Sequence, residues 1–192
     1  MPPPKDETGV DTGVIDKVVH LTPDFAIGPQ PEAADFEALK AAGFAAVLNA
    51  RPDDELGDYL KSDDARSLLG SLGLAYAHSP TENHSIFEPE IIDRFEEYLA
   101  DLPVPVFAHC KSGTRAAILW ALVAARHRNV ESVIATLRTA GQELDFLEDE
   151  MRESAKSAEE DAPFRLKQDS LLKLGQSKLL GAGDPRPVDG PD

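Results

Sequence analysis

The chain has 192 residues, with 35 Asp and Glu against 19 Lys and Arg, and a formal net charge of −16 at pH 7. This negative surplus repels nucleic-acid phosphates and anionic membrane surfaces, so neither nucleic acid nor a membrane is expected as a partner. A single Cys excludes an intramolecular disulfide and a Cys-rich metal site. No apolar run approaches the roughly 20 residues that cross a bilayer, and no secretion signal opens the chain, so a cytoplasmic location is expected.

Composition divides the chain into three parts. Residues 1–13 are rich in Pro, Gly and charge and are predicted to be a disordered lead-in. Residues 14–151 carry the apolar patterns of one domain, of a size that a single core can support. Residues 152–192 are predicted to form a charged, largely flexible tail, whose Leu residues leave open a short docked or partner-binding helix.

Short apolar runs and helical patterns alternate through the predicted domain. The strands are expected over residues 16–21, 25–27, 44–48, 74–78 and 104–108. The helices are expected between Pro31 and Gly43, from a cap at Ser62 to Gly73, from Glu88 to Leu99, from Ala116 to Ala125, from Val130 to Gly141 and around Leu144 to Met151. Trp120 lies in one of these helices and is expected in the core.

This alternation predicts an α/β fold with a central, mostly parallel sheet flanked by helices. The first two strands are expected to form a small hairpin beside it. In such sheets the ligand-binding residues collect where the strands end. The strand ends at Asn49, His78 and His109 are therefore expected to share one edge.

The most informative stretch is the loop that joins the last predicted strand to its helix. It contains the single cysteine, Cys110, followed by Lys111, Ser112, Gly113, Thr114 and Arg115. Backbone N–H groups at a helix start have no partner within the helix and favour a negative charge. A helix terminus and a nearby cation can lower a cysteine pKa from near ~8.5 to roughly 3.5–7.5, so the thiolate becomes available as a nucleophile. We therefore predict Cys110 and Arg115 as catalytic residues and the residues between them as the anion-binding loop.

Three further residues are candidates for the same site. Arg51 follows a predicted strand and is expected to supply a second cation, although a charged loop is more often simply solvated. His109 is expected to orient the loop and to lie with the anion-binding residues. Glu82 is a weaker candidate for a general acid, since carboxylates in such loops are often turn residues. The other histidines are expected at unremarkable surface or core positions.

The loop resembles that of the cysteine-dependent phosphatases of tyrosine and dual-specificity type, whose signature has five residues between Cys and Arg. Here only four residues separate Cys110 from Arg115. One residue on a helix is a rotation of about 100°, so this arginine can point as in a phosphatase only if the loop is tighter. The Cys-x-x-Gly-x-Arg pattern is instead similar to the loop of rhodanese-type sulfurtransferases, in which the cysteine carries a persulfide.

The wider sequence resembles the beta-lactamase hydrolase-like sulfurtransferase family over about residues 18–147. The segments that carry this resemblance are Phe25-Ala26-Ile27-Gly28-Pro29-Gln30, Ala41-Ala42-Gly43-Phe44, Asn49-Ala50-Arg51-Pro52-Asp53, His109 to Arg115 through Trp120, and Ala140-Gly141. The resemblance implies a phosphatase-like fold with a rhodanese-type loop, often fused to persulfide dioxygenase or sulfide:quinone reductase modules. No His-x-His-x-Asp-His pattern occurs, so the iron site of a dioxygenase module is missing from this sequence.

The first functional hypothesis is sulfur transfer through a Cys110 persulfide. The expected donor is a small anionic compound such as glutathione persulfide or thiosulfate, and the expected acceptor is a thiol or sulfite. No metal or organic cofactor is implied, and a separate persulfide-oxidising or sulfide-oxidising protein is left open as a partner. Two alternatives remain. One is a phosphatase with Glu82 as general acid, and the other is a non-catalytic redox or sulfide sensor whose tail beyond Met151 binds a partner.

Overall fold

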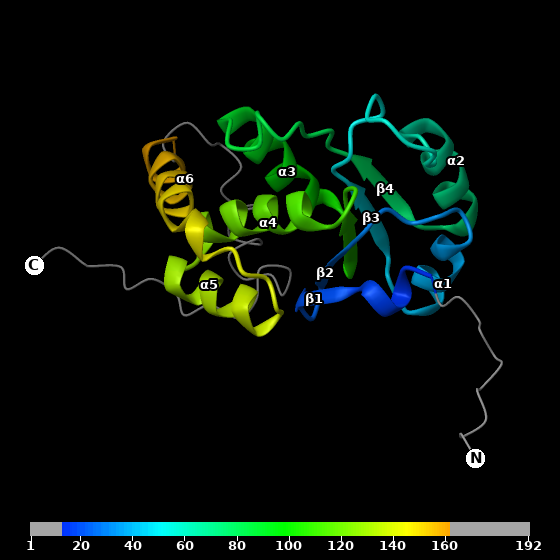
Figure 1. The fold of residues 1–192 in the computed structure, drawn as a ribbon, viewed down its shortest axis with the longest axis horizontal. Coiled ribbons are helices and arrows are strands. Elements are labelled where there is room, and N and C mark those ends of the chain that lie inside the picture. The colour runs from blue at the N-terminus through cyan, green and yellow to red at the C-terminus, as the bar shows by residue number, and fades with distance from the viewer. Residues whose placement is uncertain (1–12, 162–192) are drawn as a thin grey trace, which may run out of the picture.

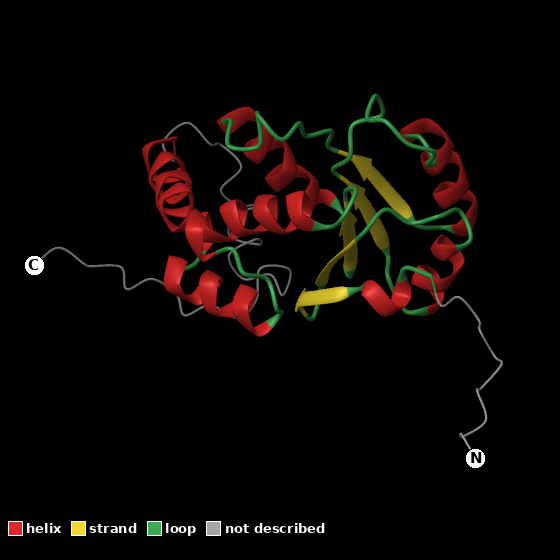
Figure 2. Ribbon diagram, viewed as in Figure 1, coloured by secondary structure: helices red, strands yellow, loops and turns green. Residues whose placement is uncertain are grey.

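The computed structural model describes residues 13–161, which form a five-stranded sheet with helices on both faces (Figures 1 and 2). The strand order is β1-β2-β5-β3-β4. The strands are β1 (Val19–Thr22), β2 (Phe25–Gly28), β3 (Ala46–Asn49), β4 (Ala75–His78) and β5 (Val106–His109). All neighbouring pairs are parallel except β1 and β2, which form the predicted hairpin. The predicted α/β class with a mostly parallel sheet is therefore confirmed.

The helices form two layers around this sheet. They are η1 (Ile15–Lys17), α1 (Asp35–Ala41), α2 (Ser62–Leu72), α3 (Pro89–Asp101), α4 (Thr114–His127), α5 (Val130–Thr139), η2 (Asp145–Leu147) and α6 (Glu148–Asp161). Helices α1 and α2 pack on one face, whereas α3 to α6 gather on the other (Figure 1). None of the helices between residues 13 and 161 has the length and apolar character needed to span a bilayer.

The strand that leads to Cys110 is buried on both of its faces. Val106 and Ala108 lie in the core with α4, and Phe107 lies in the smaller core with α1 and α2. This division follows from the strand period of two, which sends successive side chains to opposite faces. Helix α4 is itself buried on nearly all sides, and Trp120 at its middle is fully buried, as predicted. The loop between β5 and α4 is therefore held at both ends by core packing.

The strand register places the predicted site at one edge of the sheet. Asn49 at the end of β3 is aligned with His78 on β4 and with His109 on β5. On the other side of β5, Gly28 is aligned with His109. The expectation that the three strand ends share one edge is confirmed.

Three local expectations differ from the structure. Asp16 lies in the 3-10 helix η1 and not in the first strand. Ser62 is the first residue of α2 and not its cap, because its backbone N and its hydroxyl both donate to the carboxylate of Asp53. Helix α6 crosses the boundary predicted at residue 151 and runs to Asp161, with Ser154 buried against α4. The predicted lead-in, apart from Gly13, and the tail beyond residue 161 lie outside the described residues.

Helices α3, α4 and α6 are joined by a buried ionic network. The carboxylate of Glu96 accepts from Arg126 at 2.5 Å and pairs with the Nε2 atom of His127 at 2.7 Å. Arg126 also donates to Asp93 and to the hydroxyl of Ser154. Burial alone would raise the pKa of Glu96, but the hydrogen bond from His127 and the charge of Arg126 lower it to about 2. His127, expected at an unremarkable position, is therefore part of this network.

The lowered pKa of Glu96 predicts an acid-sensitive contribution to stability. A carboxylate whose pKa is lower in the folded state than in the unfolded state stabilises the fold at pH values above its unfolded-state pKa. This stabilisation is lost as the pH falls through the folded-state pKa. Between pH 6 and pH 3 the wild type should lose about 2 kcal/mol more unfolding free energy than Glu96→Gln. Urea unfolding at several pH values measures this difference. Equal losses in the two proteins would contradict the assigned role of Glu96.

Candidate active site

The Cys110 sulfur lies at the N-terminal end of α4, where the sequence predicts an anion-binding loop. Strand β5 ends at His109, and α4 begins at Thr114 after the N-cap residue Gly113. The backbone N–H of Gly113 donates to the Sγ atom of Cys110 at 3.1 Å. Because unpaired amides at a helix start favour negative charge, this loop can stabilise a sulfur anion. Cys110 is only 1% exposed.

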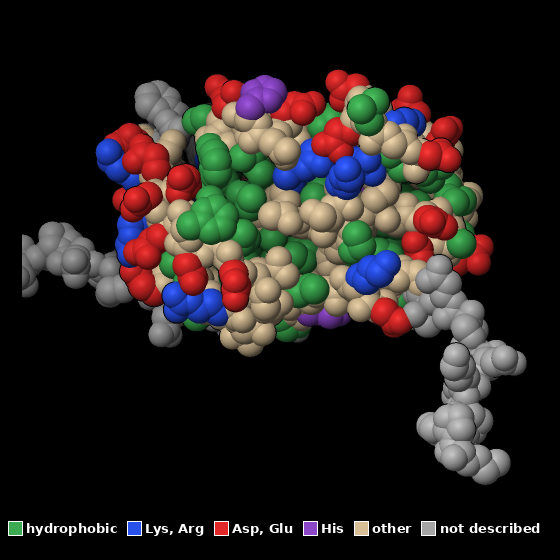
Figure 3. Space-filling view, in the orientation of Figure 1, with side chains coloured by type: hydrophobic (Ala, Val, Ile, Leu, Met, Phe, Trp, Pro, Cys, Tyr) green, Lys and Arg blue, Asp and Glu red, His purple; other side chains and the backbone are tan. Residues whose placement is uncertain are grey.

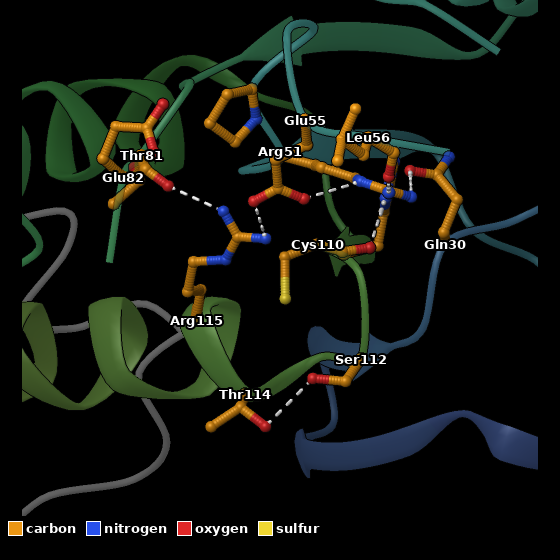
Figure 4. Close-up of polar contacts among 12 residues, drawn as sticks. Gln30, Arg51, Glu55, Leu56, Thr81, Glu82, Cys110, Ser112, Thr114 and Arg115 are labelled. Carbon is orange, nitrogen blue, oxygen red and sulfur yellow. Dashed lines mark hydrogen bonds and ion pairs between the residues drawn. The ribbon is translucent and has the colours of Figure 1, made fainter. Parts of the chain in front are cut away.

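The loop is anchored to the neighbouring strands through backbone contacts. The N–H of Gln30 donates to the carbonyl of Lys111 at 3.2 Å, and the N–H of Ala50 donates to the carbonyl of His109 at 2.8 Å. The side chain of Lys111 is exposed. The hydroxyls of Ser112 and Thr114, also exposed, lie 3.2 Å apart (Figure 4). The exposed side chains leave the backbone amides as the groups of this loop that face the Cys110 sulfur, and the anion-binding roles predicted for these three residues remain predictions.

Gly113 has a backbone conformation that no other residue adopts without strain. Its φ is +99°, and an added Cβ would lie 3.1 Å from the carbonyl oxygen of Gly28. Gly113→Ala should therefore lower the free energy of unfolding by about 1–3 kcal/mol. It should also reduce activity at least about tenfold, because the N–H that contacts the Cys110 sulfur would shift. Thermal unfolding and the catalytic rate of the purified chain measure the two effects.

Gly141→Ala is the matched control for this prediction. Gly141 also has a positive φ, of +73°, but a Cβ added there would meet no atom within 4 Å. The control should show the backbone strain without the crowding, and its activity should remain close to wild type. Equal activity losses in the two variants would contradict a specific role for Gly113.

Arg115 is buried and held by two contacts. Its Nη1 atom donates to the backbone carbonyl of Thr81 at 2.8 Å, and its Nη2 atom pairs with Oε1 of Glu55 at 2.6 Å. The other carboxylate oxygen of Glu55 accepts from Nε of Arg51 at 2.9 Å. Figure 4 shows the Glu55 carboxylate between the two guanidinium groups, with the Cys110 sulfur below them in this view. The structure thus brings Arg51 and Arg115 to the same carboxylate, and the role of Arg51 as a second cation for a substrate stays a prediction.

Arg51 is held by several contacts besides its ion pair with Glu55. It is 5% exposed, and its guanidinium carbon lies 3.4 Å from the centroid of the Tyr59 ring. It also donates to the carbonyl of Leu56 at 3.2 Å and, at 3.5 Å, to the side chain of Gln30. Its backbone carbonyl lies 2.8 Å from Nε2 of His78. These contacts make Arg51 a rigid part of the site.

His109 lies inside the protein and is uncharged. Its ring stacks on Phe107, and its Nδ1 atom is 3.4 Å from the carbonyl of Cys110. Burial lowers the pKa of His109 to about 3, with a smaller lowering from the charges of His78 and Arg51 and an opposing effect of the contact with Cys110. A neutral ring offers an anion no charge. The geometry fits the predicted orienting role better than direct anion binding.

Glu82, the candidate general acid, is half-buried in the loop after β4. Its neighbour Thr81 contacts Arg115 through the backbone. Among the described residues, no hydrogen bond or ion pair joins the Glu82 carboxylate to the Cys110 loop. Its predicted role therefore stays a prediction.

Glu55 and Thr81 are the site residues that sequence reasoning missed. Glu55 stands in a charge-rich loop, which is usually solvated, and Thr81 contributes only a backbone carbonyl. The single sequence signal was the position of both loops after parallel strands. Within residues 13–161 no group of three or more His, Cys, Asp and Glu side chains could hold a metal ion.

The surface around the site is electrostatically mixed. Figure 3 shows basic side chains gathered near the N-terminal end of α4 and acidic side chains distributed around the rim of this face. Given a net charge of −16, an anionic substrate must be attracted by this local arrangement against the field of the whole chain.

Comparisons with known proteins agree with the fold. A sequence model of the family described as "Beta-lactamase hydrolase-like protein, phosphatase-like domain" matches residues 17–127. A beta-lactamase hydrolase-like protein of Agrobacterium fabrum is 39% identical over 106 residues, which are 55% of this chain and 24% of that protein. A protein of the same name from Xylella fastidiosa strain Temecula1 is 35% identical over 106 residues, with the same coverage of both chains. The chain thus matches about a quarter of the length of these curated relatives.

A solved structure shares the fold at lower identity. It is a candidate phosphatase from Neisseria meningitidis, with a TM-score of 0.62 and 24% identity. The similarity covers 72% of this chain and 98% of that chain. The phosphatase-like architecture is therefore shared well beyond the Cys110 loop.

Proposed function

Because the chain belongs to the family of the phosphatase-like domain of beta-lactamase hydrolase-like proteins, we propose that it is a cysteine-dependent enzyme that transfers sulfane sulfur through a Cys110 persulfide. The observation that carries this proposal is the short, tight loop. Four residues separate Cys110 from Arg115, and the Gly113 amide lies 3.1 Å from the Cys110 sulfur. A loop that encloses a sulfur so closely suits a cargo of one sulfur atom.

The reaction has two displacement steps at sulfur. The Cys110 thiolate attacks the outer sulfur of a donor R–S–SH, a new S–S bond forms on Cys110, and the donor bond breaks with its electron pair on R–S⁻. The proton stays on the transferred sulfur. A thiolate or sulfite acceptor then attacks this outer sulfur, and Cys110 leaves as the thiolate. The sulfane sulfur moves without net oxidation, so no redox cofactor is needed.

The surroundings of the loop support sulfur transfer over phosphoryl transfer. Two contacts of Arg115 already go to Thr81 and Glu55, and Glu55 adds negative charge where a phosphoryl dianion would need positive charge. A thiolate leaves readily from a disulfide bond without protonation, whereas an alkoxide leaving group needs a general acid. Sulfur transfer therefore does not depend on Glu82.

Phosphatase action is the second candidate function. The phosphatase-like fold and the description of the family favour it. In this case Cys110 would attack phosphorus, the loop amides and Arg115 would bind the phosphoryl oxygens, and Glu82 would protonate the leaving group. The carboxylate of Glu82 would have to approach the loop when substrate binds.

One side-by-side assay of the purified chain distinguishes these functions. Sulfur transfer is measured from glutathione persulfide and from thiosulfate to sulfite, glutathione or cyanide, and phosphate release from nitrophenyl phosphate and phosphotyrosine peptides. We expect sulfur transfer, together with a gain of one sulfur atom on Cys110 by mass spectrometry. Phosphate release without any sulfur adduct on Cys110 would replace this proposal with the phosphatase.

A further inference from the structure

The carboxylate of Glu55 lies where the two arginines of the site would otherwise meet the negative charge of a substrate. One oxygen is 2.6 Å from Nη2 of Arg115 and the other is 2.9 Å from Nε of Arg51 (Figure 4). The site thus contains its own anion, bound by both cations.

Contacts of Tyr59 hold the backbone of the loop that carries this carboxylate. The hydroxyl of Tyr59 donates to the backbone carbonyls of Glu55, at 3.0 Å, and Pro52, at 2.7 Å. The same ring packs against the guanidinium of Arg51. The side chain of Glu55 is 23% exposed, whereas that of Arg51 is 5% exposed. Glu55 therefore sits at the solvent-facing rim of a rigid, buried cation pair.

The Glu55 carboxylate changes the net charge of the site and therefore the charge of the substrate that the site prefers. Arg51 and Arg115 contribute two positive charges, and Glu55 removes one of them. The Cys110 thiolate that attacks the donor cancels the remaining positive charge, so a donor group with one negative charge leaves the site with one excess negative charge and a dianion leaves it with two. The repulsion is strong because burial of the arginines weakens solvent screening.

We propose that Glu55 is a specificity-determining residue that selects against dianionic donors, so that the preferred donor is an organic persulfide and not thiosulfate. This inference rests on the proposed sulfur transfer. Thiosulfate carries two negative charges next to the sulfur that Cys110 attacks. A persulfide carries at most one negative charge on its sulfur pair. The same repulsion disfavours phosphoryl dianions.

The test compares wild type with Glu55→Gln, which keeps the shape of the side chain and removes its charge. The rates at which thiosulfate and glutathione persulfide load sulfur onto Cys110 are followed by intact-protein mass spectrometry. In Glu55→Gln the ratio of the thiosulfate rate to the persulfide rate should rise at least tenfold. Glu55→Asp retains the charge and should keep the ratio of wild type within threefold.

Binding of inorganic sulfate provides a second measurement that does not depend on catalysis. The amide resonance of Gly113 in the ¹⁵N-labelled full chain is followed while sodium sulfate replaces sodium chloride at constant ionic strength. Glu55→Gln should bind sulfate at least fivefold more tightly than wild type. Asp54→Asn is the matched control, since it removes an exposed carboxylate from the same loop, and its affinity should stay within twofold of wild type.

The outcomes separate this inference from the proposed function. If both donors load Cys110 and Glu55→Gln changes neither the donor ratio nor the affinity for sulfate, the role of Glu55 is overturned and sulfur transfer stands. If neither donor loads Cys110 in wild type, sulfur transfer is overturned. The sulfate titration then still decides whether Glu55 rejects dianions, and unchanged or absent sulfate binding in Glu55→Gln would overturn that role.

Discussion

Replacing Cys110 with Ser is expected to lower kcat/KM for sulfur transfer at least about a thousandfold. A hydroxyl does not ionise near neutral pH and cannot carry a persulfide, so the first displacement loses its nucleophile and the second loses the persulfide that the acceptor attacks. The mass spectrum of the variant should show no sulfur adduct after exposure to glutathione persulfide. Steady-state transfer to sulfite and intact-protein mass spectrometry measure the two effects.

The Cys110 variant also tests whether the nucleophile lies elsewhere. Serine is close to cysteine in size, and its hydroxyl can accept the hydrogen bond that the Gly113 N–H donates to Cys110, so the variant should fold with a thermal midpoint near that of wild type. Retained sulfur transfer in a folded Cys110→Ser protein would show that Cys110 is not the sulfur carrier. Loss of phosphate release alone would instead support the phosphatase.

Changing Arg115 to Lys is expected to lower kcat/KM about a hundredfold while the overall charge stays the same. The planar guanidinium reaches the Thr81 carbonyl and the Glu55 carboxylate with two different nitrogens. A single ammonium group on a flexible chain cannot reproduce both directions. Both the rate of Cys110 loading and the steady-state rate should fall, and a stopped-flow assay separates them.

Arg94→Lys is the matched control for Arg115. Arg94 also contacts the loop that contains Thr81. It donates to the carbonyl of Pro80 at 2.6 Å and to the hydroxyl of Ser79 at 3.3 Å. Its replacement should change kcat/KM by less than about threefold. If both lysine variants keep wild-type rates, the two simultaneous contacts of the Arg115 guanidinium are not needed for catalysis.

The fold could be read largely from local patterns. Continuous apolar runs such as Val106 to Ala108 indicated strands buried on both faces, and the structure places them in two cores. Gly73 was expected to end a helix and does so in a left-handed conformation. The cap of that helix was missed because its acceptor, Asp53, lies nine residues before Ser62. The length of α6 was missed because its exposed face is strongly charged and resembles a flexible tail.

The candidate site, too, could be predicted from local sequence only in part. Local sequence pointed to the loop from Cys110 to Arg115, because a strand, a glycine and a helix start adjoin within a few residues. Glu55 is distant in sequence from Arg115, and its contact depends on how the loops after β3 and β5 meet.

The sequence by itself therefore determined the α/β class, the shared strand edge and the loop that holds Cys110, because each depends on periodicity and on neighbours along the chain. The tertiary structure alone decided that Thr81 binds Arg115 and that Glu55 lies between two arginines. The physical reason is that these contacts are set by the register of parallel strands, which brings separate loops to one edge and leaves no local pattern in the sequence. The net charge of the candidate site therefore depends on the contact between these loops, which only the tertiary structure shows.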